Sequence, residues 1–180
     1  MSCEALQTIQ KNCSNNIGGI KNVWVNQQDQ ITTATPIVPS GSWQIATITV
    51  ADPCVPFAIN RNTGNYTEET AVDLINGSTF VTQTITLMFN RRDKDKSEAI
   101  NVLGSGQQYL AVFIQDANDK YWYFENVQLT ATGEGSGTAR ADGSKYSITL
   151  LAEAEHLAYE VLSTVITGNP TDFPPAVQSA

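Results

Sequence analysis

Lysine and arginine are scarce in this chain, which has 10 of them against 18 aspartate and glutamate residues and a net charge of −8. A protein that binds nucleic acid through its phosphates needs a basic surface, so this balance argues against that function. Charged residues make up only 16% of the chain, below the roughly 25% usual in soluble domains. Neutral polar residues take their place, as is common in proteins that contact many copies of themselves, because burying unpaired charge is costly.

Cysteines are also few. Cys3, Cys13 and Cys54 are odd in number and widely spaced, which excludes a disulfide framework and lacks the spacing of a zinc site. We expect reduced thiols, as in a protein made in a host cytoplasm, with a pair between Cys3 and Cys13 left open as the alternative.

Long apolar runs are missing as well. No segment reaches the length of a membrane span, and Glu4 and Gln7 interrupt the start of the chain before the apolar core of a signal peptide develops. We therefore expect neither membrane insertion nor secretion.

Reaction chemistry has little support in the sequence. His156 is the only histidine, and no nucleophile elbow, phosphate-binding loop or complete calcium loop occurs. Glu153 and Glu155 would share one face of a strand, as paired catalytic carboxylates must, but solvated charges at a sheet edge are the commoner reason for such a pair. We predict no catalytic residue, no cofactor and no metal site. An enzyme would have to rest on His156 or on these two glutamates.

The patterns that are present are those of β-structure. Short apolar or β-branched segments separated by turns predict strands at residues 20–25, 44–50, 57–60, 66–74, 79–90, 109–115, 120–132 and 146–151. The clearest is 79–90, where Ile85, Leu87 and Phe89 alternate with polar or less buried positions. The chain suits one domain, residues 1–180, with a mainly β fold: an antiparallel β-sandwich or barrel of about eight to ten strands.

The remaining segments flank this core, which we place at residues 18–166. Residues 1–17 predict an N-terminal arm with a short helix at 3–12, and the proline-bearing residues 167–180 predict an extended C-terminal tail. Residues 31–42, rich in Thr, Pro, Gly and Ser, predict an extended loop or sheet edge. Residues 157–166 fit strand or helix.

One short helix is predicted in the middle of the chain, at residues 97–103. Ser97 is a suitable N-cap and Gly104 a suitable stop. Ile100 and Leu103 lie three apart, so one side of the helix would dock on a sheet, without which two turns would be marginal.

Residues 109–126 predict a hairpin whose turn is Asp116-Ala117-Asn118-Asp119. Alternation places Tyr121 and Tyr123 on one face and Trp122 and Phe124 on the other. One face is expected in the core. The other would be an aromatic surface for a subunit or a sugar, with Trp122 in the core, in a subunit contact or at a bound ligand.

Two further segments are candidate contacts between copies. Residues 133–143 form a predicted flexible tongue whose glycines include Gly133, Gly135 and Gly137, with Arg140 beside them. The run Arg91-Arg92-Asp93-Lys94-Asp95-Lys96 holds four of the ten basic residues. It fits a solvated loop, or a contact of Arg91, Arg92, Lys94 and Lys96 with an acidic face of a neighbouring copy.

The order of these features resembles tail tube (major tail) proteins of tailed phages that infect Bacteroidetes. The resemblance covers roughly residues 18–165. It rests on these short motifs: Gly18-Gly19-Ile20-Lys21 before a strand, the alternating strand at 79–89, the helix near 97–103, Asp116-Ala117-Asn118-Asp119-Lys120-Tyr121-Trp122, Thr138-Ala139-Arg140-Ala141-Asp142-Gly143, and Tyr146-Ser147-Ile148-Thr149-Leu150.

The resemblance implies a β-sandwich with a flanking helix that assembles into rings, commonly hexameric, which stack into a tube for DNA in the virion. It would place residues 133–143, 31–42 and 169–180 at contacts between subunits. An acidic chain suits such a conduit because a negative lumen repels phosphate. The cysteine-containing N-terminal segment and the proline-bearing middle depart from the pattern, which leaves an auxiliary capsid or tail-ring protein as the alternative. A secreted carbohydrate-binding β-sandwich is the rival from another class.

Overall fold

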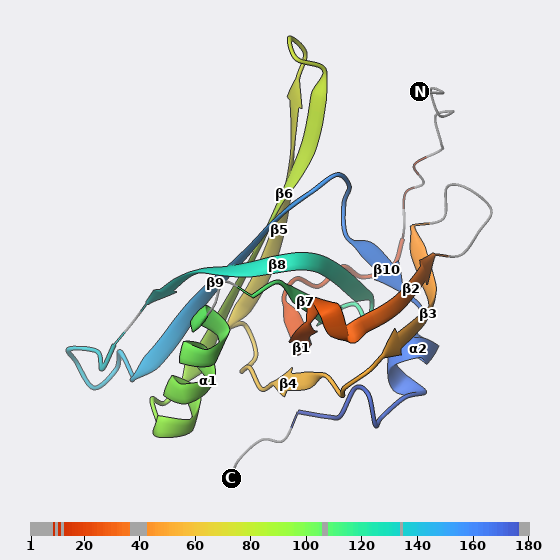
Figure 1. Cartoon of the computed structure of the whole chain (residues 1–180). Coiled ribbons are helices and arrows are strands. Elements are labelled where there is room, and N and C mark those ends of the chain that lie inside the picture. The colour runs from red at the N-terminus through yellow and green to blue at the C-terminus, as the bar shows by residue number, and fades with distance from the viewer. Residues whose placement is uncertain are drawn as a thin grey trace.

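The computed structural model of the chain describes residues 9, 11, 13–36, 43–105, 108–133 and 135–176. The helix predicted at residues 3–12, residues 37–42 of the predicted loop and the last four residues of the predicted tail lie outside the described residues, apart from positions 9 and 11. The described part is mainly β and forms a curled half-barrel with a short helix, which confirms the predicted fold class (Figure 1).

Ten described strands form two sheets that share one strand. The first sheet runs, in spatial order, β2 (Ile31–Pro36), β3 (Gln44–Val50), β10 (Tyr159–Val161), β8 (Tyr121–Gly133), β7 (Leu110–Asp116), β1 (Ile20–Gln27) and β4 (Val55–Phe57). The second sheet runs β5 (Gly64–Asp73), β6 (Ser78–Asn90), β9 (Lys145–Ala154) and residues 128–133 of β8, which we term the distal half of β8. All pairings are antiparallel except that of β10 with β3, which is parallel.

The strand β8 joins the sheets because it bends at a bulge. Leu110 pairs with Val127 while Val112 pairs with Phe124, so two residues of β8 face one residue of β7. At this point Asn126 has a φ of 54°, a left-handed conformation that asparagine tolerates better than most residues. Phe124 and Val127 therefore both face the same core although they are three residues apart.

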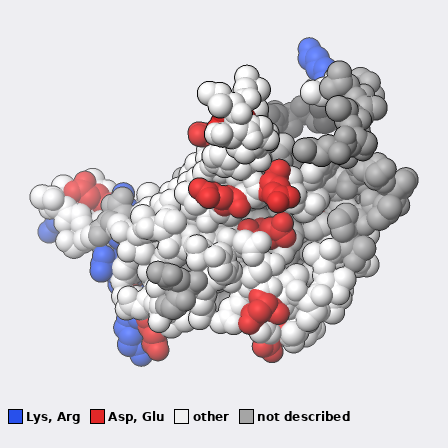
Figure 2. Space-filling view, turned by 45° about the horizontal axis from the view of Figure 1, so that its top comes forward, with Lys and Arg blue, Asp and Glu red and all other residues white. Residues whose placement is uncertain are grey.

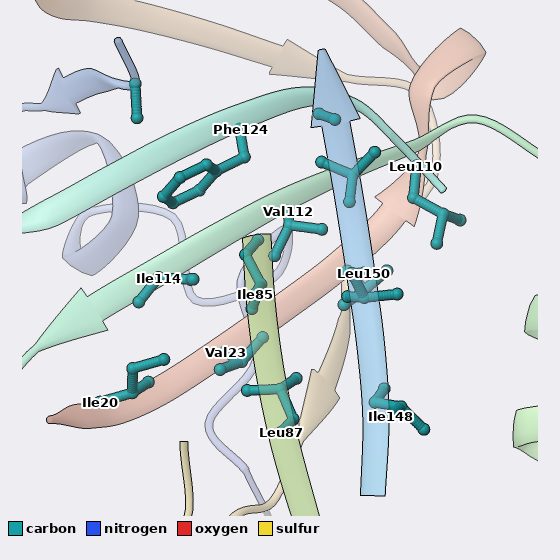
Figure 3. Close-up of a cluster of buried hydrophobic side chains, with 14 of the residues drawn as sticks. Ile20, Val23, Ile85, Leu87, Leu110, Val112, Ile114, Phe124, Ile148 and Leu150 are labelled. Atoms are coloured by element: carbon teal, nitrogen blue, oxygen red, sulfur yellow. The ribbon is translucent and has the colours of Figure 1, made fainter. Parts of the chain in front are cut away.

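The first core fills the space between the two sheets. Figure 3 shows Ile85, Leu87, Ile148 and Leu150 of the second sheet pointing toward side chains of β1, β7 and β8 that cross them. The alternation that predicted a buried face on β6 is confirmed, since Ile85, Leu87 and Phe89 are buried. This core is the principal source of hydrophobic stabilisation that links the sheets.

A second core lies on the opposite face of the first sheet. Tyr121 and Tyr123 are buried there together with Trp24 and Phe113. The expectation of an exposed aromatic face on the hairpin is therefore wrong, because both faces of β8 are covered in this region. Alternation separates the two faces of a strand but does not indicate whether one or both meet other elements.

The C-terminal segment covers this second core. The helix α2 (Ser163–Thr167) buries Val165 and Ile166, and Phe173 is buried against Trp24 and Phe113. Within the tail predicted at residues 167–180, Phe173 and Pro174 are thus held against the sheet, the latter by a hydrogen bond of 2.8 Å from the Trp24 indole to its carbonyl. The ambiguous segment 157–166 divides into β10 and α2.

The mid-chain helix α1 (Lys94–Gly104) begins earlier than predicted. Asp93, not Ser97, is its N-cap, since the Asp93 carboxylate accepts a hydrogen bond of 2.8 Å from the Lys96 N–H. Ile100 and Leu103 pack against the first core, as predicted. A second correction concerns β4, which lies at residues 55–57 instead of 57–60 and tolerates Pro56 because it is at the edge of the sheet.

Burial of a cysteine thiol and two tyrosine hydroxyls makes the stability of the fold sensitive to high pH. Burial raises the pKa of Cys54, Tyr66 and Tyr123 to about 12. Above about pH 9 the unfolded chain loses these protons before the folded chain does, so the free energy of unfolding should fall as pH rises. Urea unfolding should show constant stability from about pH 7 to 8.5 and a decline above pH 9 that Tyr66→Phe makes shallower. Constant stability up to about pH 10.5 would contradict this expectation.

Candidate assembly surfaces

The described part of the chain has no group of three or more His, Cys, Asp or Glu side chains that would hold a metal ion. None of its helices is long and apolar enough to cross a membrane. Glu153 and Glu155, considered as paired carboxylates, are both exposed. These residues offer no enclosed site, which leaves the surfaces of the described part as the candidates for function.

His156 belongs to a small aromatic cluster at the surface. Its ring lies 4.5 Å from the ring of Tyr159 and 5.4 Å from that of Trp43, and Trp43 stacks on Tyr159 at 5.3 Å. The His156 Nε2 is 3.5 Å from the Glu125 carboxylate. The side chain of Trp43 is 53% exposed, so this cluster, not Trp122, would bind a sugar ring.

Trp122 occupies a structural position. It is partly buried against the first core, and its indole N–H donates a hydrogen bond of 3.1 Å to the Asp116 carboxylate. Packing in the core, rather than a subunit contact or a bound ligand, accounts for the surroundings of Trp122.

Most of the basic residues are gathered on one side of the molecule. Figure 2 shows most Lys and Arg of the face in view along one side, with acidic residues across the middle. Six of the ten lie where β6 ends, α1 begins and the tongue closes, namely Arg91, Arg92, Lys94, Lys96, Arg140 and Lys145. In contrast, residues 62–90, which contain β5 and β6, have no lysine or arginine. The fold therefore separates a basic end from a cation-free hairpin.

Part of this basic cluster stabilises its own surroundings. The Arg92 guanidinium lies 4.2 Å from the centre of the Tyr146 ring. Lys96 pairs with Asp93 and donates to the Arg91 carbonyl at 3.1 Å. Lys94, which is highly exposed, approaches only Asp95, at 3.5 Å. Arg91 to Asp93 thus form the predicted exposed loop, whereas Lys94 to Lys96 begin the helix α1, and Lys94 is the most exposed of the ion-paired charges in this run.

The tongue, residues 133–143, is less open than its glycine content predicts. The Asp142 carboxylate accepts hydrogen bonds from the N–H groups of Thr138 and Ala139, at 2.9 and 2.7 Å, and these bonds lower the pKa of Asp142. The Lys145 N–H donates to the Gly135 carbonyl at 3.1 Å. Gly137, with a φ of 73°, would bring a side chain against Asp142, so glycine is required there. Arg140 lies exposed in the turn.

Replacing residues 136–142 by Asn-Gly tests the tongue. The bond between Lys145 and Gly135 and the packing of Tyr146 would be kept, so the monomer should unfold within about 1 kcal/mol of the original protein. If the tongue contacts neighbouring copies, assembly observed by light scattering should be lost. Shortening that leaves assembly unchanged would exclude the tongue from the contact.

The second sheet has an open edge on each side. Among the described strands β5 pairs only with β6, so its other side, over ten residues, has no strand partner there. The distal half of β8 pairs only with β9 among the described strands, and a groove of about 350 Å³ runs between Leu129–Thr132 and Ile100 and Gly104 of α1. Unpaired backbone N–H and C=O groups on such edges are ready to pair with another chain.

The outer face of the second sheet is rich in threonine and carries few charged side chains. Thr82, Thr84 and Thr86 of β6 point away from the core because their neighbours in the strand point into it. At the centre of this face Glu69 and Glu153 flank Thr82 across the strands, and Asp73 lies on the same face at the hairpin end of β5. Lys145, at the far end of β9, is next to the basic end.

The tip of the β5–β6 hairpin is apolar. Leu74 and Ile75, in the turn, are 89% and 95% exposed, and Val72 and Phe80 beside them are also exposed. Figure 1 shows the hairpin projecting from the body of the molecule. We did not predict this surface, although two aliphatic residues directly before the turn residues Asn76 and Gly77 are a signal that the sequence contains.

Comparison of the chain with protein-family models, with curated proteins and with solved structures finds no match. The functional assignment therefore rests on the open edges, the outer face and the hairpin tip described above.

Proposed function

We propose that this chain is a non-enzymatic virion protein of a tailed phage, which associates with copies of itself into rings that stack into a tail tube for the passage of DNA. The open edges of the second sheet are the observation that supports it most strongly. They lie at opposite sides of one sheet, on β5 and on the distal half of β8. A contact between unlike edges is head-to-tail, and head-to-tail contacts form a ring when the rotation from one copy to the next closes, and an open filament when it does not.

In the proposed ring, β5 of one copy pairs with the distal half of β8 of the next. The main-chain hydrogen bonds of an added strand supply affinity without needing a charged interface. The groove between β8 and α1 leaves space alongside this edge for the incoming strand. Each copy would then contribute its second sheet to one continuous β-wall, and the sequence resemblance favours six copies.

The outer face of the second sheet would line the lumen of such a ring, because its other face is covered by the first core. Thr82, Thr84 and Thr86 present short neutral side chains to the lumen, and Glu69 and Glu153 add negative charge. A wall with no basic residue along its centre would not hold the phosphates of passing DNA. DNA is a transient cargo in this proposal, and the partners are other copies and neighbouring virion proteins.

Negative-stain electron microscopy of the concentrated protein, with light scattering alongside, tests the proposal. Rings or tubes are expected to appear as concentration rises. A protein that stays monomeric at every concentration would contradict self-assembly and favour an auxiliary capsid or tail-ring protein that needs its partner.

A carbohydrate-binding β-sandwich is the second candidate, and the exposed Trp43 with its neighbours Tyr159 and His156 favours it. Tryptophan stacked on a second ring offers an apolar face to a sugar. Saturable quenching of tryptophan fluorescence by a sugar, lost in Trp43→Ala, would support this function. The proposed ring needs neither Trp43 nor any sugar.

A further inference from the structure

The tip of the β5–β6 hairpin is a rigid apolar projection. The Asp73 carboxylate accepts hydrogen bonds from the N–H groups of Ile75 and Asn76, at 2.9 and 3.1 Å, and from the Asn76 side chain at 2.6 Å. The Gly77 N–H donates to the Asp73 carbonyl at 2.8 Å. These bonds hold Leu74 and Ile75 outward before any partner binds, so little conformational entropy would be lost on docking.

A cleft of matching chemistry lies between β4 and α1. It has a volume of about 400 Å³, and its apolar lining includes Val55, Phe57, Val102 and Leu103. Val55 and Val102 at its rim are each 57% exposed. Within the described residues, the hairpin tip and this cleft are where large exposed aliphatic side chains occur in groups.

The tip cannot enter the cleft of its own chain. The 13 residues of β6 lead from the tip to the end at which α1 begins, a distance of about 43 Å at the usual rise of a strand. Figure 1 shows the tip on one side of the body and both α1 and β4 on the opposite side. An occupant with the shape of the tip must therefore come from another molecule.

Charge favours a second copy as that molecule. The hairpin contains no lysine or arginine and carries Glu68, Glu69 and Asp73, whereas the α1 end has a net positive charge, with its six lysine and arginine residues set against Asp93, Asp95, Glu98 and Asp142. Placing two copies head to tail along β6 brings the acidic hairpin to the basic end. Placing them tip to tip would bring like charges together.

We infer that Leu74 and Ile75 of one copy seat in the cleft between β4 and α1 of a second copy, head to tail. This contact deepens the proposed function and rests on it: pairing at the edges of the second sheet closes the ring, and the tip joins one ring to the next. The repeat along the stack would be close to the length of β6, about 40 Å.

A cysteine pair tests the contact directly. In a chain with Cys3→Ser, Cys13→Ser and Cys54→Ala, Ile75→Cys and Val102→Cys are placed together, and each is also placed alone. Mild oxidation of the pair should give a ladder of disulfide-linked multimers on a non-reducing gel. A chain with one of the two cysteines has no head-to-tail link and should give no ladder. Absence of a ladder from the pair, under conditions in which the protein assembles, would overturn the inference.

Polar substitution separates this inference from the proposed function. Leu74→Asn with Ile75→Asn should leave single rings but raise the concentration needed for stacking at least about tenfold, whereas the control Leu157→Asn, at another exposed leucine, should not. Normal stacks from the tip variant would overturn the inference and leave ring formation intact. Absence of any rings from the unmodified protein would overturn both. Flotation of the protein with phosphatidylcholine vesicles, lost in the tip variant, would assign the tip to a lipid surface instead.

Discussion

Proline at one of two threonines of β5 is expected to prevent assembly while the monomer stays folded. Thr67 and Thr70 are both exposed and lie three apart in a strand without a bulge. On an antiparallel strand the N–H and C=O groups of successive residues point to opposite sides, so one of these threonines bonds to β6 and the other faces the open edge. The pair thus provides a variant and its matched control in the same strand.

The two prolines should have opposite effects. Where the N–H faces β6, proline removes a ladder bond and should lower the free energy of unfolding by at least about 1 kcal/mol. Where it faces the open edge, stability should change by less than about 0.5 kcal/mol, but an incoming strand loses its donor and meets the proline ring. Urea unfolding and light scattering measure the two effects. If both variants assemble as the unmodified protein does, β5 is not the edge that joins copies.

Phe173→Ala is expected to be among the most damaging single substitutions in the chain, although it lies in a segment that looks like a tail. Phe173 is 4% exposed and makes edge-to-face contacts with Phe113 at 5.0 Å and Trp24 at 6.3 Å. Removing a buried phenylalanine typically lowers the free energy of unfolding by about 3–5 kcal/mol. The loss would also loosen the neighbouring bond from the Trp24 indole to the Pro174 carbonyl.

Urea unfolding with tryptophan fluorescence measures this effect, because Trp24 is in contact with the substituted side chain. Pro175→Ala is the control, since Pro175 is exposed two residues away. An effect of Phe173→Ala below about 1 kcal/mol would mean that the segment is not packed on the sheet, as the proline-rich sequence suggested.

The start of α1 shows where prediction from sequence reached its limit. Asp93 and Ser97 are both good N-caps, and nothing in the adjacent residues ranks one above the other. Contacts with Tyr146 of β9 favour Asp93 as the N-cap. The Arg92 guanidinium packs over the Tyr146 ring, and the Tyr146 hydroxyl contacts the Ser97 side chain, which then lies inside the helix. That contact joins residues 49 apart, so the first turn is chosen by a strand that the local sequence does not contain.

The sequence alone determined most of the strand-forming segments, the presence of a helix near residues 97–103 and the shortage of basic residues. Alternation of apolar and polar residues and the turn residues reflect interactions between residues close in the chain, so they can be recognised without knowing the rest of the fold. Tertiary structure decided which faces are covered. Because of the bulge at Asn126, the side chains of Phe124 and Val127 both face the first core. The C-terminal segment covers Tyr121 and Tyr123 on the other face of the sheet.

The same division holds for the assembly surfaces. Leu74 and Ile75 are visible in the sequence as aliphatic residues beside a turn, but only the length of β6 places them at the opposite end of the molecule from Val55 and Val102. Likewise β5 is a predictable strand, and only the pairing of all ten strands leaves it at an edge. Exposure and edges are properties of what remains uncovered when distant segments pack, and a local pattern carries no information about that.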